Sequence, residues 1–332
     1  MEVTFLGTGS GAPTRQRNVS AIALQLPQRA EWWLFDCGEG TQHQLLRAPH
    51  LRLSQLTRIH ITHVHGDHLF GLPGLLASRA LAMGGSTPVH IHAPESVEGW
   101  LRTTLRVSLM RYGFPVHFVP VREGVVHADA DFTTTAVPVR HRVEAWAFAI
   151  REHDQPGRFD IEGARAMGIP EGPVYGRLKR GEIVTLDDGR RIDGRTLVGA
   201  DRPGRKVVFS GDTAWSRELV ELATDADLLV HEATYGEGDT LLADRAGHST
   251  AAGAARVASE ARARSLVLTH FSSRYDGVAG GGVDDLTAEA RTIFPAVRAA
   301  HDLLRVKVAR QEGSASASDT VASASAVSTN PL

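Results

Sequence analysis

The sequence contains a single cysteine, Cys37, among its 332 residues. One thiol cannot form a disulfide within the chain, so a disulfide-framed fold is excluded and a reducing compartment is expected. The sequence has no run of about 18 apolar residues, which a membrane-spanning helix would need. The strand-like residues Glu2–Leu6 are not preceded by a signal-peptide pattern. We therefore expect a cytoplasmic protein with no membrane partner.

The chain also lacks an excess of charge of either sign. Its formal net charge is −2 and its sequence pI is about 6.8, so the overall balance does not indicate binding to nucleic acid or to an acidic membrane. Binding to a polyanion would have to come from a local basic patch. Hydrophobic residues make up 42% of the sequence, which is enough for one large α/β domain or two smaller ones. Residues 311–332 are rich in Ser and Ala, and we expect a disordered tail there.

The densest group of metal-ligand residue types is the run His63-Val-His65-Gly66-Asp67-His68. An alternating apolar pattern precedes this run and a helical pattern follows it, which predicts a strand-to-helix turn. His63 and His65 are two positions apart, so in extended backbone their side chains project to the same side. Gly66 permits a tight bend, after which Asp67 and His68 point back to the same spot.

Three imidazoles and one carboxylate within one turn form a ligand set for zinc or a similar metal. They offer more ligands than one tetrahedral ion needs when it also keeps a water, so two adjacent ions are the simpler interpretation. The alternative is a loop that carries surface histidines. A single histidine would favour that alternative, but this density of ligand types argues against it.

Further candidate ligands follow predicted strands elsewhere in the chain. His141, Asp212 and His270 each stand at the end of a strand pattern, and ligands collect at the carboxyl ends of strands in open α/β sheets. A carboxylate such as Asp212 can bridge two metals, although an N-cap for the helix that starts near Trp215 is its alternative role. His248 lies just before a predicted Ala-rich helix.

Strands dominate the first part of the chain and alternate with helices afterwards, which predicts layered sheets with helices outside. Residues 7–12, Gly-Thr-Gly-Ser-Gly-Ala, have the weak dinucleotide-binding spacing G-x-G-x-x-A. No helix pattern follows them, so we interpret them as the start of a glycine-rich loop that carries Arg15 and Arg17, with an ordinary turn as the alternative. His90 and His92 are interpreted as a polar strand face.

Residues 153–203 differ from the rest of the chain because they are rich in glycine and poor in apolar residues. The segment is too polar to be a core and too long to be a connector. It is therefore predicted to be an arm inserted into a domain that spans residues 1–310. Arg177, Lys179 and Arg180 give it a local positive charge, for which solvated charges on a mobile insertion are the alternative.

The turn at residues 63–68, followed by His141, Asp212 and His270, resembles the metallo-β-lactamase superfamily. This resemblance implies an α/β fold, a four-layer αββα sandwich with a dinuclear metal site between its two sheets. His65 stands where the di-iron flavoprotein branch of the superfamily has a glutamate, and this difference favours hydrolysis.

The finer resemblance is to the ribonuclease Z family, the tRNA 3′-processing endonucleases, and it reaches from the first residue to about residue 308. Residues 13–18, Pro-Thr-Arg-Gln-Arg-Asn, resemble the family loop P-x-K-x-R-N. Arg15 replaces the usual lysine there, and its planar guanidinium differs from an ammonium. Residues 231–234 match the family's HEAT motif, and residues 248–250 match its HST loop.

The ribonuclease Z resemblance implies a role for each site residue. Two Zn²⁺ ions per subunit, with Mn²⁺ as the alternative, would be held by His63, His65 and His141, by Asp67, His68 and His270, and by a bridging Asp212. Asp67 would also orient the attacking water, and His248 would protonate the leaving oxygen while Glu232 fixes the ring of His248. The implied substrate-binding residues are Arg15, Arg17, Asn18, Gly172, Pro173, Arg177, Lys179, Arg180 and Thr250.

On this resemblance we expect a zinc-dependent endoribonuclease that cleaves the 3′ trailer from precursor tRNA after the discriminator nucleotide. The products would be a tRNA 3′-hydroxyl and a trailer 5′-phosphate. The segment Gly168–Arg180 resembles the protruding flexible arm with which the family grips tRNA, and the family implies a homodimer.

Two other functions use the same residues. A small-molecule phosphodiesterase or arylsulfatase-like hydrolase would need only the metal site, and the arm and the loop of residues 13–18 argue against it. A non-catalytic, zinc-stabilised RNA-binding protein would need neither Asp212 nor His248, and both are present. One closed zinc site would indicate a structural role, and two ions with an open position would indicate catalysis.

Overall fold

The chain is represented by a computed structural model that describes residues 1–83, 87–276 and 282–310. It divides into two compact units, a larger one of residues 1–153 and 205–309 and a smaller one of residues 154–204. The predicted disordered tail of residues 311–332 lies outside the described residues.

The first sheet of the larger unit has seven strands in the order β16-β1-β2-β3-β4-β5-β6. Strands β3 to β6 run parallel, and β16, β1, β2 and β3 pair antiparallel. The strands are β1 (Glu2–Gly7), β2 (Ala21–Leu26), β3 (Glu31–Phe35), β4 (Leu56–His60), β5 (Val89–Ala93), β6 (Val116–Pro120) and β16 (Arg305–Lys307).

The second sheet also has seven strands, in the order β15-β14-β13-β12-β9-β8-β7. Strands β12 to β15 are parallel, and β7, β8, β9 and β12 pair antiparallel. The parallel strands β12 to β14 consist mainly of Val, Leu and Phe, and all of their residues except Lys206 are buried, as is typical of parallel strands covered on both faces. The strands are β7 (Gly124–Ala128), β8 (Phe132–Pro138), β9 (Trp146–Glu152), β12 (Lys206–Phe209), β13 (Leu228–Glu232), β14 (Leu266–Thr269) and β15 (Val297–Ala299).

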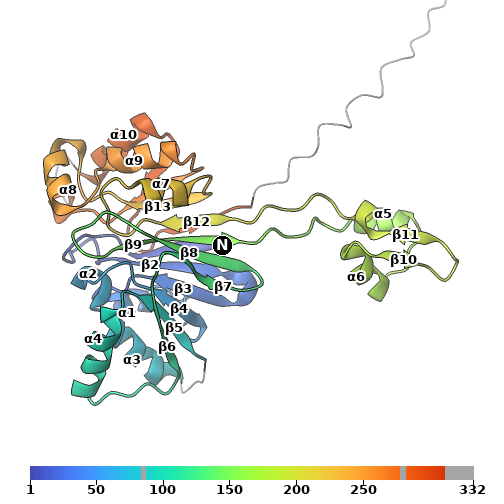
Figure 1. Cartoon of the computed structure of the whole chain (residues 1–332), viewed down its shortest axis with the longest axis horizontal. Helices are drawn as coiled ribbons and strands as arrows, with labels where there is room; N and C mark the ends of the chain where they lie inside the picture. The colour runs from blue at the N-terminus through green and yellow to red at the C-terminus, as the bar shows by residue number, and fades with distance from the viewer. Residues whose placement is uncertain (84–86, 277–281, 311–332) are drawn as a thin grey trace, which may run out of the picture. The chain divides into compact units, whose positions relative to one another are not determined.

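Helices cover the outer face of each sheet (Figure 1), which confirms the predicted four-layer αββα sandwich. Those beside the first sheet are α1 (Thr41–Leu46), α2 (Gly66–Leu69), α3 (Leu72–Met83) and α4 (Ser96–Val107). Those beside the second are α7 (Arg217–Ala223), α8 (Thr240–Ala246), α9 (Ala251–Glu260) and α10 (Val283–Ile293). Short 3₁₀ turns are η1 (Pro27–Arg29), η2 (Leu53–Gln55), η4 (Glu237–Asp239) and η5 (Ser273–Tyr275).

The core between the two sheets is largely aromatic near the site. Phe35 stacks on Phe209 with ring centroids 3.9 Å apart and on His60 at 4.6 Å, and His60 stacks on His92 at 4.8 Å. His92 is buried, so the predicted polar strand face is wrong for this residue. The rings of His60 and His92 share the inward face of β4 and β5, which the second sheet covers.

The site lies where strand ends meet. In each sheet, parallel strands end at the same edge: β3 and β4 in the first sheet, and β12, β13 and β14 in the second. The loops that follow these strands therefore meet at one edge of the sandwich. A polar residue lies within three residues of the end of each strand, namely Asp36 after β3, His63 after β4, Asp212 after β12, Thr234 after β13 and His270 after β14. The fold thereby collects side chains that are far apart in the sequence.

The smaller unit has its own apolar core, formed by Ala164, Ile169, Leu178, Val184, Leu186 and Leu197. Sequence composition had suggested a segment with few apolar residues, but those present converge. Bridge pairs Gln155–Arg202 and Phe159–Val198 join its incoming and outgoing segments. Its elements are α5 (Ile161–Ala166), α6 (Pro173–Lys179), β10 (Ile183–Thr185), β11 (Arg191–Asp193) and η3 (Gly194–Leu197).

Among the described residues, none of the helices has both the length and the apolar character needed to cross a membrane.

Candidate metal centre

The predicted strand-to-helix turn is present. β4 ends at His60, and α2 begins at Gly66 with His65 as its extended N-cap residue, at φ −63° and ψ 148°. Asp67 and His68 lie in the single turn of α2. His63 forms an isolated bridge with Ala145, which fixes the segment against the second sheet.

Loops from the second sheet bring the remaining predicted ligands to this turn. His141 follows β8, Asp212 follows β12, and His270 follows β14. Asp212 is not an N-cap, because Ser216 caps α7. His270 has a φ of 60°, a backbone conformation that is uncommon outside glycine.

Two of the clusters of possible metal ligands among the described residues have the same members as the predicted triplets. Ligand atoms of His63, His65 and His141 lie within 4.8 Å of one another, and so do those of Asp67, His68 and His270. In the first triplet, His65 Nδ1 lies 3.1 Å from His63 Nε2 and 3.3 Å from His141 Nε2. In the second, His68 Nε2 lies 3.2 Å from His270 Nε2.

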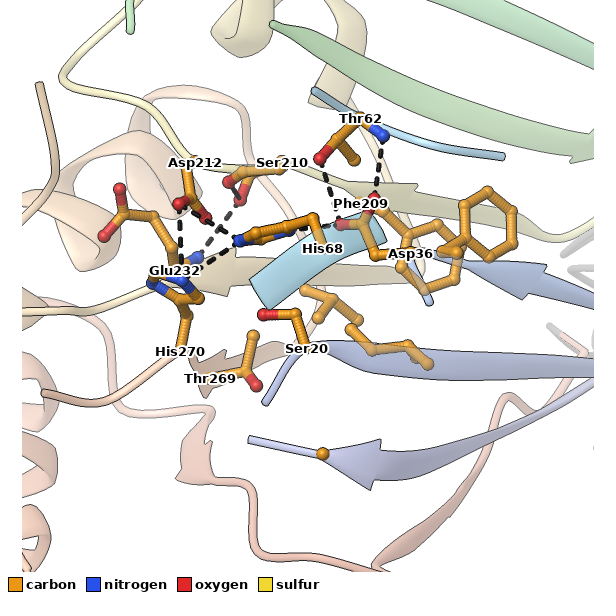
Figure 2. Close-up of a pocket in the computed structure, with 15 residues that line it drawn as sticks. Ser20, Asp36, Thr62, His68, Phe209, Ser210, Asp212, Glu232, Thr269 and His270 are labelled. Carbon is orange, nitrogen blue, oxygen red and sulfur yellow. Dashed lines mark hydrogen bonds and ion pairs between the residues drawn. The ribbon is translucent and has the colours of Figure 1, made fainter. Parts of the chain in front are cut away.

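Asp212 lies between the two triplets and is buried. Its Oδ2 is 3.6 Å from His63 Nε2, 3.3 Å from His68 Nε2 and 3.3 Å from His270 Nε2. Figure 2 shows Asp212, His68 and His270 converging on one side of a cavity that extends back between the sheets. A single carboxylate oxygen therefore faces ligands from both triplets.

Residues that the sequence analysis missed orient the histidines of the turn. Asp36 Oδ2 accepts from His68 Nδ1 at 2.7 Å and from Thr62 Oγ1 at 2.9 Å, and Thr62 Oγ1 in turn accepts from His63 Nδ1 at 2.9 Å. Both histidines thus present Nε2 to the centre. Such hydrogen bonds to the far nitrogen are typical of metal-bound imidazoles.

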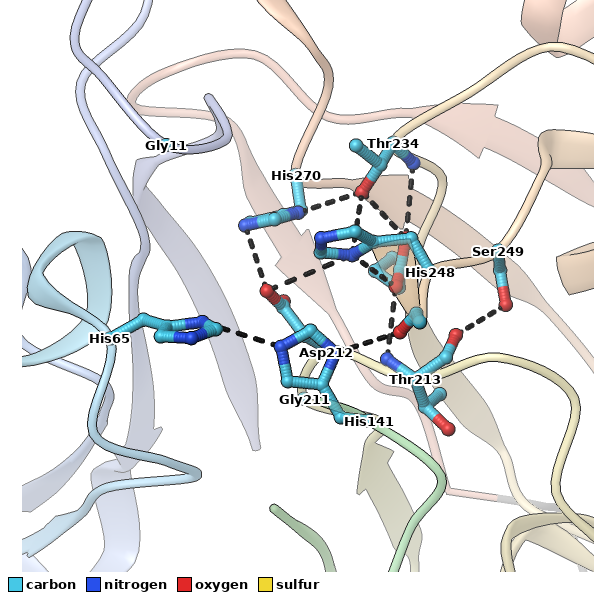
Figure 3. A network of polar contacts seen from close by, with 12 residues as sticks. Gly11, His65, His141, Gly211, Asp212, Thr213, Thr234, His248, Ser249 and His270 are labelled. Atoms are coloured by element: carbon cyan, nitrogen blue, oxygen red, sulfur yellow. Dashed lines mark hydrogen bonds and ion pairs between the residues drawn. The ribbon is translucent and has the colours of Figure 1, made fainter. Parts of the chain in front are cut away.

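The same arrangement holds on the second sheet. His141 Nδ1 donates to the carbonyl of Gly247 at 2.7 Å, and His270 Nδ1 donates to Thr234 Oγ1 at 2.9 Å. Figure 3 shows this network around Asp212, with His65 reaching His141 from the opposite side. Four of the five predicted ligand histidines therefore have their far nitrogen fixed by a protein acceptor.

The protonation tendencies fit metal binding. Burial lowers the pKa of His63, His65 and His141, which favours the neutral imidazole that a metal requires. Burial raises the pKa of Asp67, but its hydrogen bond to His270 and the charges of His68 and His270 lower it below the usual range. Three of the donors are therefore neutral imidazoles beside an ionised Asp67, a combination that suits zinc. His68 differs, because burial lowers its pKa but Asp212 and Asp36 more than offset this and raise it.

His248 stands beside this centre without belonging to either triplet. Its Nδ1 donates to Glu232 Oε1 at 2.9 Å and lies 3.9 Å from Asp212 Oδ2, and its ring stacks on that of His270. Burial lowers the pKa of His248, but Glu232 and Asp212 more than offset this and raise it to about 9. Glu232 is itself fixed by the backbone N–H of Thr213 at 2.9 Å.

The predicted substrate-binding residues of the larger unit differ in accessibility. Arg15 is exposed, whereas the Arg17 side chain is only 11% exposed and pairs with Asp276 at 2.9 Å. Asn18 donates its amide to the carbonyl of Glu39. Thr250 is the N-cap of α9 and accepts from Gly253. Arg17 and Thr250 therefore have structural partners within the protein, which the sequence motifs alone did not reveal.

The predicted arm residues lie on α6 and around it. Gly172 precedes α6 and Pro173 occupies its first turn. Arg177 and Arg180 both pair with Glu182, at 3.0 and 2.8 Å, and keep half or more of their side chains exposed. Lys179 is also exposed. The local positive charge is therefore at the surface, partly balanced by one carboxylate.

Comparison with known proteins supports the predicted superfamily and identifies a family within it. A family model described as a β-lactamase superfamily domain matches residues 194–271, and one described as anti-Pycsar protein Apyc1 matches residues 1–145. The crystal structure of human tRNase Z, short form, aligns with a TM-score of 0.66 and 29% identity over 93% of this chain and all of that one. A Bacillus subtilis metallo-β-lactamase fold protein, at 20% identity and a TM-score of 0.63, shares the fold.

Curated relatives are similar along nearly their whole length. A ribonuclease Z from Brevibacillus brevis is 52% identical over 312 residues, which covers 94% of this chain and 98% of that protein. One from Synechococcus sp. WH7803 is 52% identical over 316 residues, with 94% and 97% covered. The chain belongs to the ribonuclease Z family, hydrolytic endoribonucleases of the metallo-β-lactamase superfamily.

Proposed function

We propose that this enzyme is a zinc-dependent endoribonuclease that removes the 3′ trailer from precursor tRNA after the discriminator nucleotide. The observation that carries the proposal is Asp212, which lies within 3.6 Å of ligands from both triplets, with the His248–Glu232 pair beside it. Family membership supports RNA as the substrate class, and the human relative named tRNase Z supports tRNA.

Two zinc ions are the proposed cofactor, with Mn²⁺ as the alternative. His63, His65 and His141 would hold one ion, Asp67, His68 and His270 the other, and Asp212 would contact both. When bound, zinc acts as a Lewis acid and makes water nucleophilic near neutral pH. The fixed Nδ1 atoms of four histidines support this assignment, because they leave the lone pair of Nε2 on each ring available to a metal.

The protein's own groups would supply orientation and proton transfer. Asp67, ionised in this environment, would accept a hydrogen bond from the attacking water and direct it at the phosphorus. Attack breaks the bond between phosphorus and the 3′ oxygen of the discriminator, and protonated His248 would donate its proton to that departing oxygen. Glu232 holds the His248 ring through Nδ1, which leaves Nε2 for the leaving group. The products are a tRNA 3′-hydroxyl and a trailer 5′-phosphate.

The smaller unit is the proposed tRNA-binding arm. Arg177, Lys179 and Arg180 would contact phosphates, with Gly172 and Pro173 shaping the start of α6. Such contacts release counterions, so binding should weaken as the salt concentration rises. Recognition would rest on the shape of the tRNA. We further propose a cytoplasmic homodimer, as the family resemblance implies.

The proposed substrate can be tested by single-turnover cleavage of an end-labelled tRNA precursor with a 3′ trailer. The expected result is one cut after the discriminator and a 5′-phosphate on the trailer. If the precursor stays intact while the protein hydrolyses bis(p-nitrophenyl) phosphate, the substrate would be a small phosphodiester.

The proposed arm can be tested on the same two substrates. Deletion of residues 160–200 should raise the KM for precursor tRNA strongly, because the phosphate contacts are lost, and should leave hydrolysis of bis(p-nitrophenyl) phosphate nearly unchanged. An equal loss on both substrates would contradict a role in RNA binding.

A further inference from the structure

The glycine-rich loop, residues 7–18, contacts a predicted metal ligand directly. The backbone N–H of Gly11 donates to Asp67 Oδ2 at 2.6 Å. The same oxygen faces the centre, at 3.5 Å from His68 Nε2 and 3.4 Å from His270 Nε2. The Gly11 amide therefore fixes the Asp67 oxygen that faces His68 and His270, the other two members of the second triplet.

The loop also pairs with the segment that carries His270. Phe271, the next residue, donates its backbone N–H to the carbonyl of Thr8 at 2.9 Å, and its own carbonyl accepts from Ser10 at 3.0 Å. The loop is thus hydrogen-bonded to one ligand of the second triplet and to the neighbour of another. Among the described residues, no hydrogen bond links this loop to His63, His65 or His141.

A half-buried carboxylate, Asp302, also holds the loop. Asp302 accepts from Thr8 Oγ1 at 2.8 Å, from the backbone N–H of Asn18 at 2.7 Å and from Gln44 Nε2 at 2.5 Å. These bonds fix both ends of the loop, because Thr8 lies near its start and Asn18 at its end. Removal of the negative charge would leave buried donors poorly satisfied.

A second carboxylate adds to the same network. Asp276 accepts from Arg17 Nε at 2.9 Å and from Thr14 Oγ1 at 2.6 Å. Arg17 Nη1 in turn donates to Thr8 Oγ1 at 2.8 Å. The fully buried Thr8 hydroxyl therefore joins the two carboxylates, since it accepts from Arg17 and donates to Asp302.

We propose that Thr8 and Asp302 are positioning residues of the metal centre, which hold the glycine-rich loop so that the Gly11 amide orients Asp67. This inference rests on the proposed role of Asp67 as a metal ligand. Mutation of a residue that hydrogen-bonds to a metal ligand typically lowers metal affinity or activity by about 10- to 100-fold. Loss of the anchor should therefore weaken the ion held by Asp67, His68 and His270 more than the ion held by the other triplet.

The test uses the full-length protein and zinc itself as the probe. Zinc content per subunit after dialysis against a series of buffered zinc concentrations would be measured for wild type, Asp302→Asn and Thr8→Val. Thr8→Ser keeps the hydroxyl and serves as the conservative variant. Asp225→Asn is the matched control, because Asp225 is an exposed carboxylate that pairs with Arg262 at 3.0 Å.

The expected result is that Asp302→Asn and Thr8→Val bind one of the two ions about 10- to 100-fold more weakly, while Thr8→Ser and Asp225→Asn bind both like wild type. Excess zinc should restore hydrolysis of bis(p-nitrophenyl) phosphate by the weakened variants. If Asp302→Asn does not fold, Thr8→Val decides the question, because it only replaces the hydroxyl with a methyl group.

Two normal zinc affinities in a folded Thr8→Val protein would overturn the positioning role. Equal weakening of both ions would also contradict it, because the loop reaches only the second triplet. Failure of the proposed function would look different, since wild type itself would then bind fewer than two ions or leave the tRNA precursor uncut.

Discussion

Two groups of histidines lie between the sheets, and they differ in what their ring nitrogens meet. In the metal centre, Nδ1 of His63, His68, His141 and His270 each has a protein partner. In the aromatic stack, neither ring nitrogen of His60 or His92 has a hydrogen-bond partner among the described residues. The fixed Nδ1, which leaves Nε2 facing the centre, therefore distinguishes these four histidines from the two in the stack.

The largest effect is expected from removing the carboxylate that both triplets share. Asp212→Ala should lower hydrolysis of both precursor tRNA and bis(p-nitrophenyl) phosphate by more than about 100-fold, the upper range for the loss of a ligand's hydrogen-bond partner. Initial rates on the two substrates would be compared with those of His92→Phe, which changes the aromatic stack and leaves the metal centre intact. Similar rates for Asp212→Ala and wild type would contradict the bridging role.

The next effect separates proton donation from metal binding. His248→Ala should slow cleavage of precursor tRNA by about 10²- to 10⁴-fold, the usual contribution of a general acid. Hydrolysis of bis(p-nitrophenyl) phosphate should fall far less, because p-nitrophenolate leaves without a proton. Single-turnover rates would be measured with His117→Ala, an exposed histidine of β6, as the control. Equal losses on both substrates would indicate damage to the metal centre instead.

The pH profile sharpens the same assignment. Activity that needs protonated His248 is lost as the pH rises through its pKa, which Glu232 and Asp212 raise against the effect of burial. Glu232→Gln removes the charge nearest to His248, so the alkaline limb of kcat for precursor tRNA should move to lower pH. An unmoved alkaline limb would mean that another group donates the proton.

A smaller effect is expected from the partner of His68. Asp36→Asn should weaken zinc binding or activity by about 10- to 100-fold, because Asn offers a weaker acceptor to His68 Nδ1. The substitution should not strain the backbone, because Asp36 has a φ of 57° and Asn tolerates this left-handed conformation. Zinc affinity measured by competition with a chelator would show this change. Unchanged affinity would separate Asp36 from the metal centre.

The smallest effect concerns the aromatic stack. Burial, together with Arg58 and His127, lowers the pKa of His92 to about 3. In the unfolded chain, His92 therefore binds a proton near pH 6.5, whereas in the folded protein it stays neutral at that pH. Below pH 6.5 the free energy of unfolding falls by up to about 1.4 kcal/mol per pH unit for this reason. His92→Phe should make this acid limb shallower. The free energy of unfolding in urea would be measured at pH 7.5 and 5.5 for wild type and His92→Phe. An equal decrease between the two pH values in both proteins would contradict the lowered pKa of His92.

Much of the fold and of the central ligand set was predictable because it is encoded locally. The run from His63 to His68 contains its own spacing, and His141, Asp212 and His270 each lie within three residues of the end of a strand. The partners that orient these ligands were not predictable. Asp36, for example, reaches Thr62 and His68 across 26 and 32 residues, a contact created only by the pairing of β3 with β4.

Burial was the other property that the sequence concealed. Arg17 looks like a basic residue for binding RNA, yet Asp276 and Phe271 enclose it. His92 looks like part of a polar strand face, yet the second sheet covers it. In both cases the deciding contact comes from a segment far along the chain, so neither strand periodicity nor a short motif indicates it.

The central claim is that two ions act together in one catalytic centre. The most direct measurement is turnover of bis(p-nitrophenyl) phosphate as zinc is added stepwise to protein stripped of metal. We expect negligible turnover without zinc and a rise in turnover that ends at two equivalents of zinc per subunit, where the bound-zinc content also stops rising. Full turnover without added metal, or a single tightly bound zinc with no effect on turnover, would contradict it.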